Sequence, residues 1–214
     1  MAILPHGSWL SGRFVRLRPV IEADLPALAE MLAEPRVYAS GYVMRRRPGT
    51  PEAALAMAME YLDPTPCDGE GKGRVAYAVR LAEDSALGTA GTLVGTTSLG
   101  EAHLVHERLH LGWTLYDPRV WGTVVNPETK YLLLRHSFED LGYGRVKIQT
   151  DALNARSIAA IERLGATREG VLRRHTRRED GSFRDTVVFS VIADDWPDVR
   201  DQLLARIEAA PQFA

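Results

Sequence analysis

The chain has 214 residues, of which 45% are hydrophobic and 25% charged, an ordinary globular composition that allows a sizeable core. Its 26 basic and 28 acidic residues leave a net charge of −2, which gives no bulk electrostatic case for binding nucleic acid or a membrane surface. The single cysteine, Cys67, excludes an internal disulfide framework. No apolar run reaches the length of a signal peptide or a membrane span, so we expect a cytoplasmic protein.

The first half of the chain predicts one strand, two helices and then two more strands. Residues 13–20 alternate as a strand, Glu22 or Asp24 opens a helix that ends before Pro35, and residues 38–51 form a loop. Three adjacent arginines in that loop, Arg45, Arg46 and Arg47, are more typical of a solvated surface than of a binding site. A second helix follows at Pro51–Leu62, a Gly/Pro/Asp-rich loop runs to Gly73, and residues 74–82 and 93–101 predict adjacent antiparallel strands.

The second half alternates strands with helices. Residues 109–116 read as a strand with one buried face, and a helix then starts with Asn126 as N-cap and Pro127 in the first position, ending at Gly142. A strand at 145–150 leads to a helix capped by Asn154 and ended by Gly165. The remaining predicted elements are strands at 170–177 and 183–192 around the hairpin dipeptide Asp180-Gly181, and a helix at 194–209 with Trp196, Val199, Leu203 and Ile207 inward.

The segment between strand 109–116 and the following helix is a candidate anion site. Residues 119–125 lead into the N-terminus of that helix. Unpaired backbone N–H groups and the helix dipole both favour binding of an anion there. Neither GxxxxGK[ST] nor GxGxxG occurs there, so the two common nucleotide loops are not indicated. The alternative is a loop that caps the helix and binds nothing.

Within that segment, Arg119-x-x-Gly122-x-Val124 resembles the Q/R-x-x-G-x-G/A pyrophosphate loop of the GNAT acyltransferases, and Trp121 with Glu128 resembles the RimJ/RimL-like branch. Val124 departs from the pattern, because its two methyl groups stand where the family has a small residue. The resemblance implies that acetyl-CoA binds as co-substrate, with no metal. It places the acetyl-CoA contacts at Gly112, Trp113, Thr114, Arg119, Trp121, Gly122, Thr123, Val124, Val125, Asn126, Lys130, Asn154 and Ser157.

The same resemblance implies the fold. It covers residues 13–204 of one domain spanning residues 1–214, an α/β (α+β) domain with a mixed, mostly antiparallel sheet of about seven strands flanked by helices. The parallel strands 109–116 and 145–150 would splay apart, and the pantetheine arm of CoA would enter the gap along Gly112, Trp113 and Thr114. Family likeness also favours a homodimer.

A second motif, Asn154-x-x-Ser157 followed by Leu164-Gly165-Ala166 and Glu169-Gly170-x-Leu172-Arg173, is similar to the N-x-x-S…G-F…E-G-x-L/R run of the same branch. Many GNAT members carry a tyrosine general acid one helical turn after this serine, where this chain has Ile161. Ser157 would then protonate or hydrogen-bond the departing thiolate, and the alternative is an ordinary first-turn serine. Asn154 has a structural role as N-cap, with a pantetheine contact as an addition.

An attacking amine must be neutral, so a base or a water chain has to remove a proton. His110 is the best candidate, since it lies on the polar face of strand 109–116 and its usual pKa suits neutral pH. An equally good interpretation is that His110 has only a structural role, with its ring nitrogens hydrogen-bonded at the surface of the sheet. Glu101, Glu169 and His175 are weaker candidates, and Cys67 is a poor nucleophile because no basic helix terminus is evident beside it. His103 and His106 lack a third ligand, so no metal site is predicted.

The sequence therefore predicts an N-acetyltransferase that moves an acetyl group from acetyl-CoA to a primary amine, either a protein N-terminus or a small molecule. Two alternatives stay open. One is a CoA-binding module of the same fold without catalysis, which Val124 and Ile161 favour, and the other is a nucleotide-binding regulator.

Overall fold

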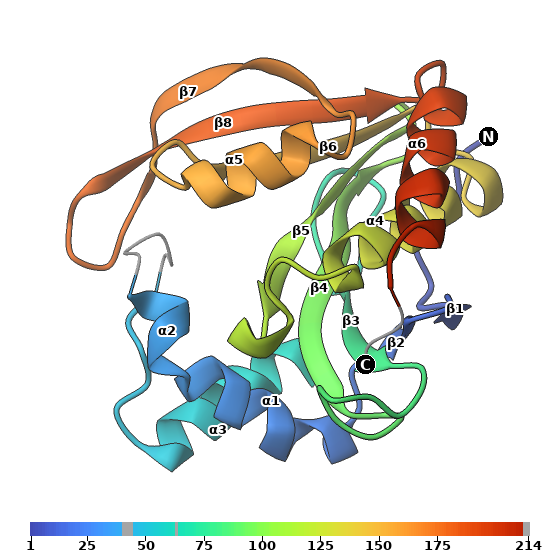
Figure 1. Cartoon of the computed structure of the whole chain (residues 1–214). Helices are drawn as coiled ribbons and strands as arrows, with labels where there is room; N and C mark the ends of the chain where they lie inside the picture. The colour runs from blue at the N-terminus through green and yellow to red at the C-terminus, as the bar shows by residue number, and fades with distance from the viewer. Residues whose placement is uncertain (40–44, 63, 212–214) are drawn as a thin grey trace.

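The computed structural model describes residues 1–39, 45–62 and 64–211, and within them the strands form one sheet ordered β1-β2-β3-β4-β5-β6-β8-β7 (Figure 1). Every neighbouring pair is antiparallel except β5 and β6. The sheet has eight strands where about seven were expected, because the short β1 also pairs with β2. The strands are β1 (Leu10–Ser11), β2 (Val15–Pro19), β3 (Arg74–Leu81), β4 (Leu93–His103), β5 (Arg108–Tyr116), β6 (Arg145–Asp151), β7 (Thr167–Arg177) and β8 (Phe183–Ile192).

Helices cover both faces of the sheet, since alternate residues of a strand point to opposite faces. On β3, Ala76 and Ala78 pack in a cluster with α1 and α3, whereas Tyr77 and Val79 belong to the larger core. That larger core also holds residues of α4 and α6. The helices are α1 (Leu25–Ala33), α2 (Pro35–Tyr38), α3 (Pro51–Leu62), α4 (Val125–Arg135), α5 (Ala155–Glu162) and α6 (Trp196–Glu208), with short 3-10 turns at Glu22–Asp24 and Pro118–Val120 and a π-helical turn at His136–Asp140.

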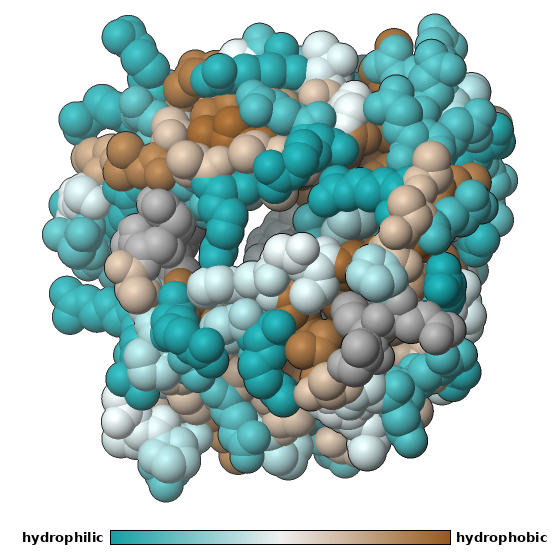
Figure 2. Space-filling view, viewed as in Figure 1, coloured by the Kyte–Doolittle hydropathy of each residue, from teal (hydrophilic) through white to brown (hydrophobic). Residues whose placement is uncertain are grey.

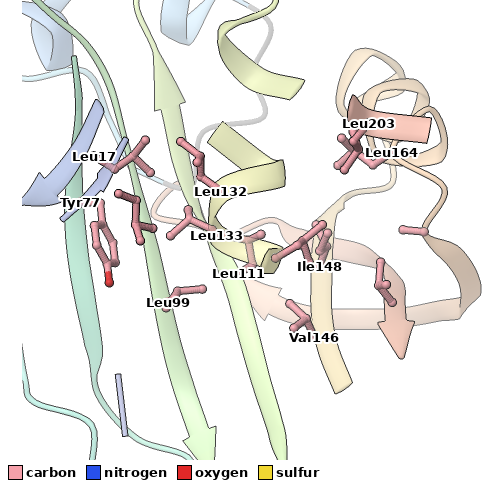
Figure 3. Close-up of a cluster of buried hydrophobic side chains, with 14 of the residues drawn as sticks. Leu17, Tyr77, Leu99, Leu111, Leu132, Leu133, Val146, Ile148, Leu164 and Leu203 are labelled. Atoms are coloured by element: carbon pink, nitrogen blue, oxygen red, sulfur yellow. The ribbon is translucent and has the colours of Figure 1, made fainter. Parts of the chain in front are cut away.

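Helix α4 packs on the face of the sheet that holds the larger core, against β1 and β2, and its Lys130 reaches Thr114 on β5. Figure 3 shows Leu132 and Leu133 of α4 in one buried cluster with Leu111 on β5 and Ile148 on β6. Strands β5 and β6 pair only through three residue pairs, which end at His110 opposite Lys147. Beyond His110 the two strands separate, so the expected splayed parallel pair is confirmed.

Most predicted elements are present with bounds within a few residues. The predictions for α3 and β8 agree with the structure, and the β3–β4 pairing is antiparallel as expected. One predicted cap is wrong: α4 begins at Val125, so Asn126 is its second residue and Val124 occupies the N-cap position. The Thr123 hydroxyl accepts the Val125 N–H at 3.3 Å, which caps the helix earlier than Asn126 could.

Two further differences concern helix ends. Proline ended α1 as predicted, but Pro35 also starts the single-turn α2, with the Glu34 carboxylate accepting the Arg36 N–H. Helix α4 ends at Arg135 and continues as a π-helical turn to Asp140, where the sequence predicted an uninterrupted helix to Gly142. Residues 40–44 of the predicted 38–51 loop lie outside the described residues. Among the described helices, none is long and apolar enough to cross a bilayer.

Candidate active site

The loop before α4 presents free backbone donors. Gly122 is exposed with φ +78°, and the N–H groups of Gly122 and Val124 have no hydrogen-bond partner among the described residues. They stand at the N-terminus of α4, where the helix leaves its own first N–H groups unpaired. Backbone donors together with the helix dipole suit a phosphate group.

Val124 does not fill this space with its methyl groups. Its side chain is 8% exposed and belongs to the hydrophobic core, together with Val125. The core therefore accommodates the larger Val124 side chain, which lies on the side of the loop away from the free N–H groups. Thr123 turns inward as well, since its hydroxyl donates to the Val120 carbonyl at 2.7 Å.

Two other loop residues are held by specific partners. Arg119 pairs with Asp117 at 2.7 Å and donates to the Leu87 carbonyl at 3.2 Å, so its charge is already partly neutralised. Trp121 donates from Nε1 to the Tyr116 carbonyl at 3.1 Å. The guanidinium carbon of Arg156 lies 3.7 Å from the centre of the Trp121 ring.

Arg156 was missed by the sequence analysis. It lies in the first turn of α5, beside Ser157, and brings a second cation to the loop that precedes α4. The sequence signal was only its place between the motif residues Asn154 and Ser157, because contact with Trp121 depends on the tertiary fold.

The space between the splayed strands is open. Figure 2 shows a deep hollow between the part of the molecule that holds α5 and the segment that joins β5 to α4. Along β5, Gly112 is half-buried while Trp113 and Thr114 are exposed. Trp113 has φ +50° and forms a bulge opposite β4, so Gly112 and Trp113 both face the side of the sheet that carries α3.

Lys130 lies on the other face of β5. Its Nζ is 2.7 Å from Thr114 Oγ1 and 3.5 Å from Thr97 Oγ1, and the residue is 5% exposed. Burial lowers the pKa of Lys130 to about 7. The Lys130 side chain therefore points from α4 toward β5, on the face of the sheet opposite to α3. Its contact with a CoA phosphate stays a prediction.

The candidate base His110 is buried beside a carboxylate. Its Nδ1 lies 3.2 Å from Glu101 Oε1, and its Nε2 has no hydrogen-bond partner among the described residues. Its ring centre is 4.6 Å from that of Trp113. A Cβ at Gly112 would lie 2.5 Å from His110 Nε2, so this position needs glycine.

Burial lowers the pKa of His110 below its usual 6.5, although Glu101 acts in the opposite direction. The His110 imidazole and the Lys147 ammonium, which is 2.6 Å from Glu101 Oε2, lower the pKa of Glu101 to about 2. At neutral pH the pair is therefore a neutral imidazole beside an ionised carboxylate. A neutral imidazole with a free Nε2 can accept a proton.

On α5, the N-cap prediction is confirmed. Asn154 Oδ1 accepts the Ser157 N–H at 2.9 Å. Ser157 is half-buried, and its hydroxyl has no hydrogen-bond partner in the described part of the chain. Ile161, at the position of the family tyrosine, is a core residue. The role of Ser157 as proton donor stays a prediction.

The weaker candidates have structural partners. Glu169 binds Arg145 and accepts from Ser190 Oγ at 2.8 Å, and His175 Nδ1 is 3.1 Å from Thr186 Oγ1. Burial raises the pKa of the Cys67 thiol, which disfavours a nucleophilic thiolate. The described residues contain no group of three His, Cys, Asp or Glu side chains placed to hold a metal ion.

With this geometry in view, comparison with known proteins decides the family. Residues 15–167 match the sequence model of the acetyltransferase (GNAT) domain, which is more than half of the chain. The chain belongs to the GNAT acetyltransferases. No curated protein matches it.

Solved structures support this GNAT assignment over nearly the whole chain. A protein from T. thermophilus, provisionally named an acetyltransferase, is 38% identical over 95% of this chain and 99% of its own, with a TM-score of 0.77. A GCN5-related N-acetyltransferase from Brucella melitensis is 23% identical, covers 96% and 88% of the two chains and has a TM-score of 0.82. RimJ from Mycobacterium smegmatis, solved with CoA-disulfide, is 18% identical over 94% and 93%, with a TM-score of 0.68. The last two show a shared fold.

The structure of this GNAT acetyltransferase separates its candidate residues into two groups. The loop at Gly122 and Val124 lies at the start of α4, while His110 and Trp113 lie on the face of β5 that carries α3. The splay between β5 and β6 connects them. A ligand that reaches from one group to the other has to pass through that opening.

Proposed function

We propose that this GNAT acetyltransferase transfers an acetyl group directly from acetyl-CoA to a primary amine, on a protein N-terminus or a small molecule. The observation that carries the proposal is the buried, neutral His110 with an unpartnered Nε2, placed beside the splay that starts at the same residue. A base at this position can act on an amine that approaches from the α3 face.

The N–H groups of Gly122 and Val124 would bind the diphosphate of CoA, and the Arg156 guanidinium would add positive charge beside them. The backbone of β5 from Gly112 to Thr114 would hold the pantetheine arm, because its side toward β6 is unpaired. RimJ, which shares the fold, was solved with a CoA derivative, and this supports the choice of co-substrate.

His110 would accept a proton from the amine, Glu101 would stabilise the imidazolium that results, and the amine nitrogen would attack the thioester carbon. The new N–C bond replaces the C–S bond, and the sulfur leaves as thiolate, which Ser157 would hydrogen-bond or protonate. RimL, a ribosomal L7/L12 α-N-protein acetyltransferase of the same fold, supports an α-amine as one acceptor class.

The proposal is tested with two measurements on the same protein, CoA affinity by calorimetry and release of free thiol from acetyl-CoA with a broad panel of amines. We expect CoA binding and thiol release with at least one amine. CoA binding without any release would leave a binding module, and stabilisation by ATP or NAD but not by CoA would indicate a nucleotide-binding regulator.

Gly122→Val tests the phosphate loop. We expect it to weaken CoA binding at least tenfold, because a side chain would cover the free N–H groups. Gly91→Val is a matched control: both glycines have positive φ, +78° and +84°, and an added Cβ at either position meets no atom within 4 Å. Equal effects of the two substitutions on CoA affinity would contradict the placement of CoA at this loop.

A further inference from the structure

A second cavity adjoins His110 on the α3 face of the sheet. It is an open pocket of about 530 Å³ between the end of α3, the loop after it and the bulge of β5. Glu101 and Trp113 contact His110 and also line this pocket. The residues that line it are Glu60, Pro64, Thr65, Gly71, Lys72, Gly73, Arg74, Glu101 and Trp113.

In this pocket the acidic side chains form ion pairs, whereas the basic side chains do not. Glu60 pairs with Arg45 at 2.7 Å, and Glu101 pairs with Lys147 at 2.6 Å. Arg74 and Lys72 have no ion pair among the described residues. The acidic groups are thus already neutralised by cations, whereas both basic groups of the pocket are available to an anion.

Arg74 is held rigidly at this site. Its guanidinium carbon lies 4.8 Å from the centre of the Tyr61 ring and 5.5 Å from that of Trp113. It donates to Ser98 Oγ at 3.2 Å and to the Glu60 carbonyl at 3.4 Å, which uses two of its five N–H donors. Burial lowers the pKa of Arg74, as expected for a guanidinium that lacks an anionic partner.

We propose that the acceptor is an amine that also carries a carboxylate, and that Arg74 binds this carboxylate while the amine reaches His110. This inference rests on the proposed function and names its substrate class. The planar guanidinium matches the two oxygens of a carboxylate.

Trp113 sets the spacing between the two contacts. Its ring centre lies 5.5 Å from the Arg74 guanidinium carbon and 4.6 Å from the centre of the His110 ring. An acceptor that stacks on this ring would reach both groups at once. Amino acids and short acidic peptides with a free amine have this arrangement of charges.

The test compares pairs of amines that differ only in having a carboxylate or the corresponding carboxamide. We expect kcat/KM for thiol release to be at least tenfold higher for the carboxylate member of each pair. Arg74→Gln should remove that preference, chiefly by raising KM for the carboxylate member of each pair, while the affinity for CoA stays unchanged.

Two further variants serve as controls for Arg74→Gln. Arg74→Lys retains the charge without the planar fork and should keep part of the preference, and an unchanged CoA affinity of Arg74→Gln excludes a folding defect in that variant. Arg16→Gln removes an exposed arginine of β2 and should leave the preference intact.

Equal kcat/KM for carboxylate and carboxamide acceptors in the unaltered protein would overturn this inference and leave the proposed function standing. The same holds if Arg74→Gln binds CoA normally and keeps the full preference. Absence of thiol release with every acceptor would overturn the proposed function, and the inference with it.

Discussion

At the scale of single residues, burial decides the protonation state of the groups around β5. His110 and Lys130 lie on opposite faces of the strand, both buried, and burial lowers the pKa of each. The two side chains differ in the groups that surround them. His110 has a carboxylate beside it and a free Nε2, whereas Lys130 has only threonine hydroxyls.

His110 is the proposed base, and its replacement tests that role directly. His110→Gln should lower kcat for acetyl transfer by about 10²-fold or more, the range of a general base, while CoA affinity stays unchanged. His106→Gln, an exposed histidine in the β4–β5 turn, is the control and should have no effect. Full activity of His110→Gln would leave proton removal to water or another group.

The pH profile separates His110 from Glu101 as the base. Because burial places the pKa of His110 below 6.5, the acid limb of kcat/KM should lie below that pH in the unaltered protein. Glu101 raises the pKa of His110, so Glu101→Gln should move this limb to lower pH and reduce the rate. A limb that does not move in Glu101→Gln would contradict the assignment.

Burying the Lys130 ammonium costs stability near neutral pH. Lys130 has a pKa of about 7 in the folded protein against its usual 10.5, so the unfolded chain binds more protons between these pH values. Stability contributed by this group therefore falls as pH decreases from 10.5 to about 7. Lys130→Met should raise the free energy of unfolding by roughly 1–4 kcal/mol at pH 7.

This gain should shrink as pH rises toward the usual lysine pKa, and urea unfolding at several pH values measures it. Lys72→Met, at an exposed lysine, is the control and should show no such pH dependence. Destabilisation by Lys130→Met at every pH would show that its hydrogen bond to Thr114 outweighs the burial of the ammonium.

At the scale of elements, α4 is fixed to the sheet by one carboxylate in its first turn. Glu128 is 2% exposed and accepts the backbone N–H groups of Arg13, Phe14 and Val15, each at 2.7 Å. A Cβ at Gly12 would lie 2.4 Å from the carboxyl carbon, so the chain before β2 has to pass close to this group. The position of α4, and with it the loop at Gly122, depends on this contact.

Glu128→Ala should lower the free energy of unfolding by about 3 kcal/mol or more, because it leaves the buried N–H groups of Phe14 and Val15 and the part-buried N–H of Arg13 without this acceptor. Urea unfolding measures the change, and Glu208→Ala, at the exposed end of α6, is the control. Equal stability of the two variants would show that water replaces the carboxylate and that the contact does not anchor the helix.

At the scale of the whole molecule, the splay leaves two halves of the sheet that share few backbone pairs. Other contacts join them: Arg45 and the backbone N–H of Arg46 reach Glu179 in the turn between β7 and β8, at 3.9 Å and 2.9 Å. Arg156 adds the contact with Trp121 near the start of α4. Figure 1 shows the β7–β8 turn on the same side of the molecule as α2, and the contacts of Arg45 and Arg46 with Glu179 join two loops that are distant in the sequence.

Alternation, caps and turn residues act over a few positions, so the elements and their order could be predicted from the sequence alone. The pattern of β5 and the Asn154 cap were both legible in this way. The loop motif around Gly122 also indicated the family, since a phosphate loop needs its residues in one short stretch.

Which side chains share a site depends on contacts between elements that are far apart in the chain. Arg74 and Trp113 are separated along the chain and meet through strand pairing, and Arg156 meets Trp121 across the splay. From the sequence, the Val124 side chain could have blocked the loop. Its direction depends on packing in the hydrophobic core, which holds it away from the free N–H groups. Burial of His110 and Lys130, which sets their pKa values, likewise follows from packing between elements and has no local signal.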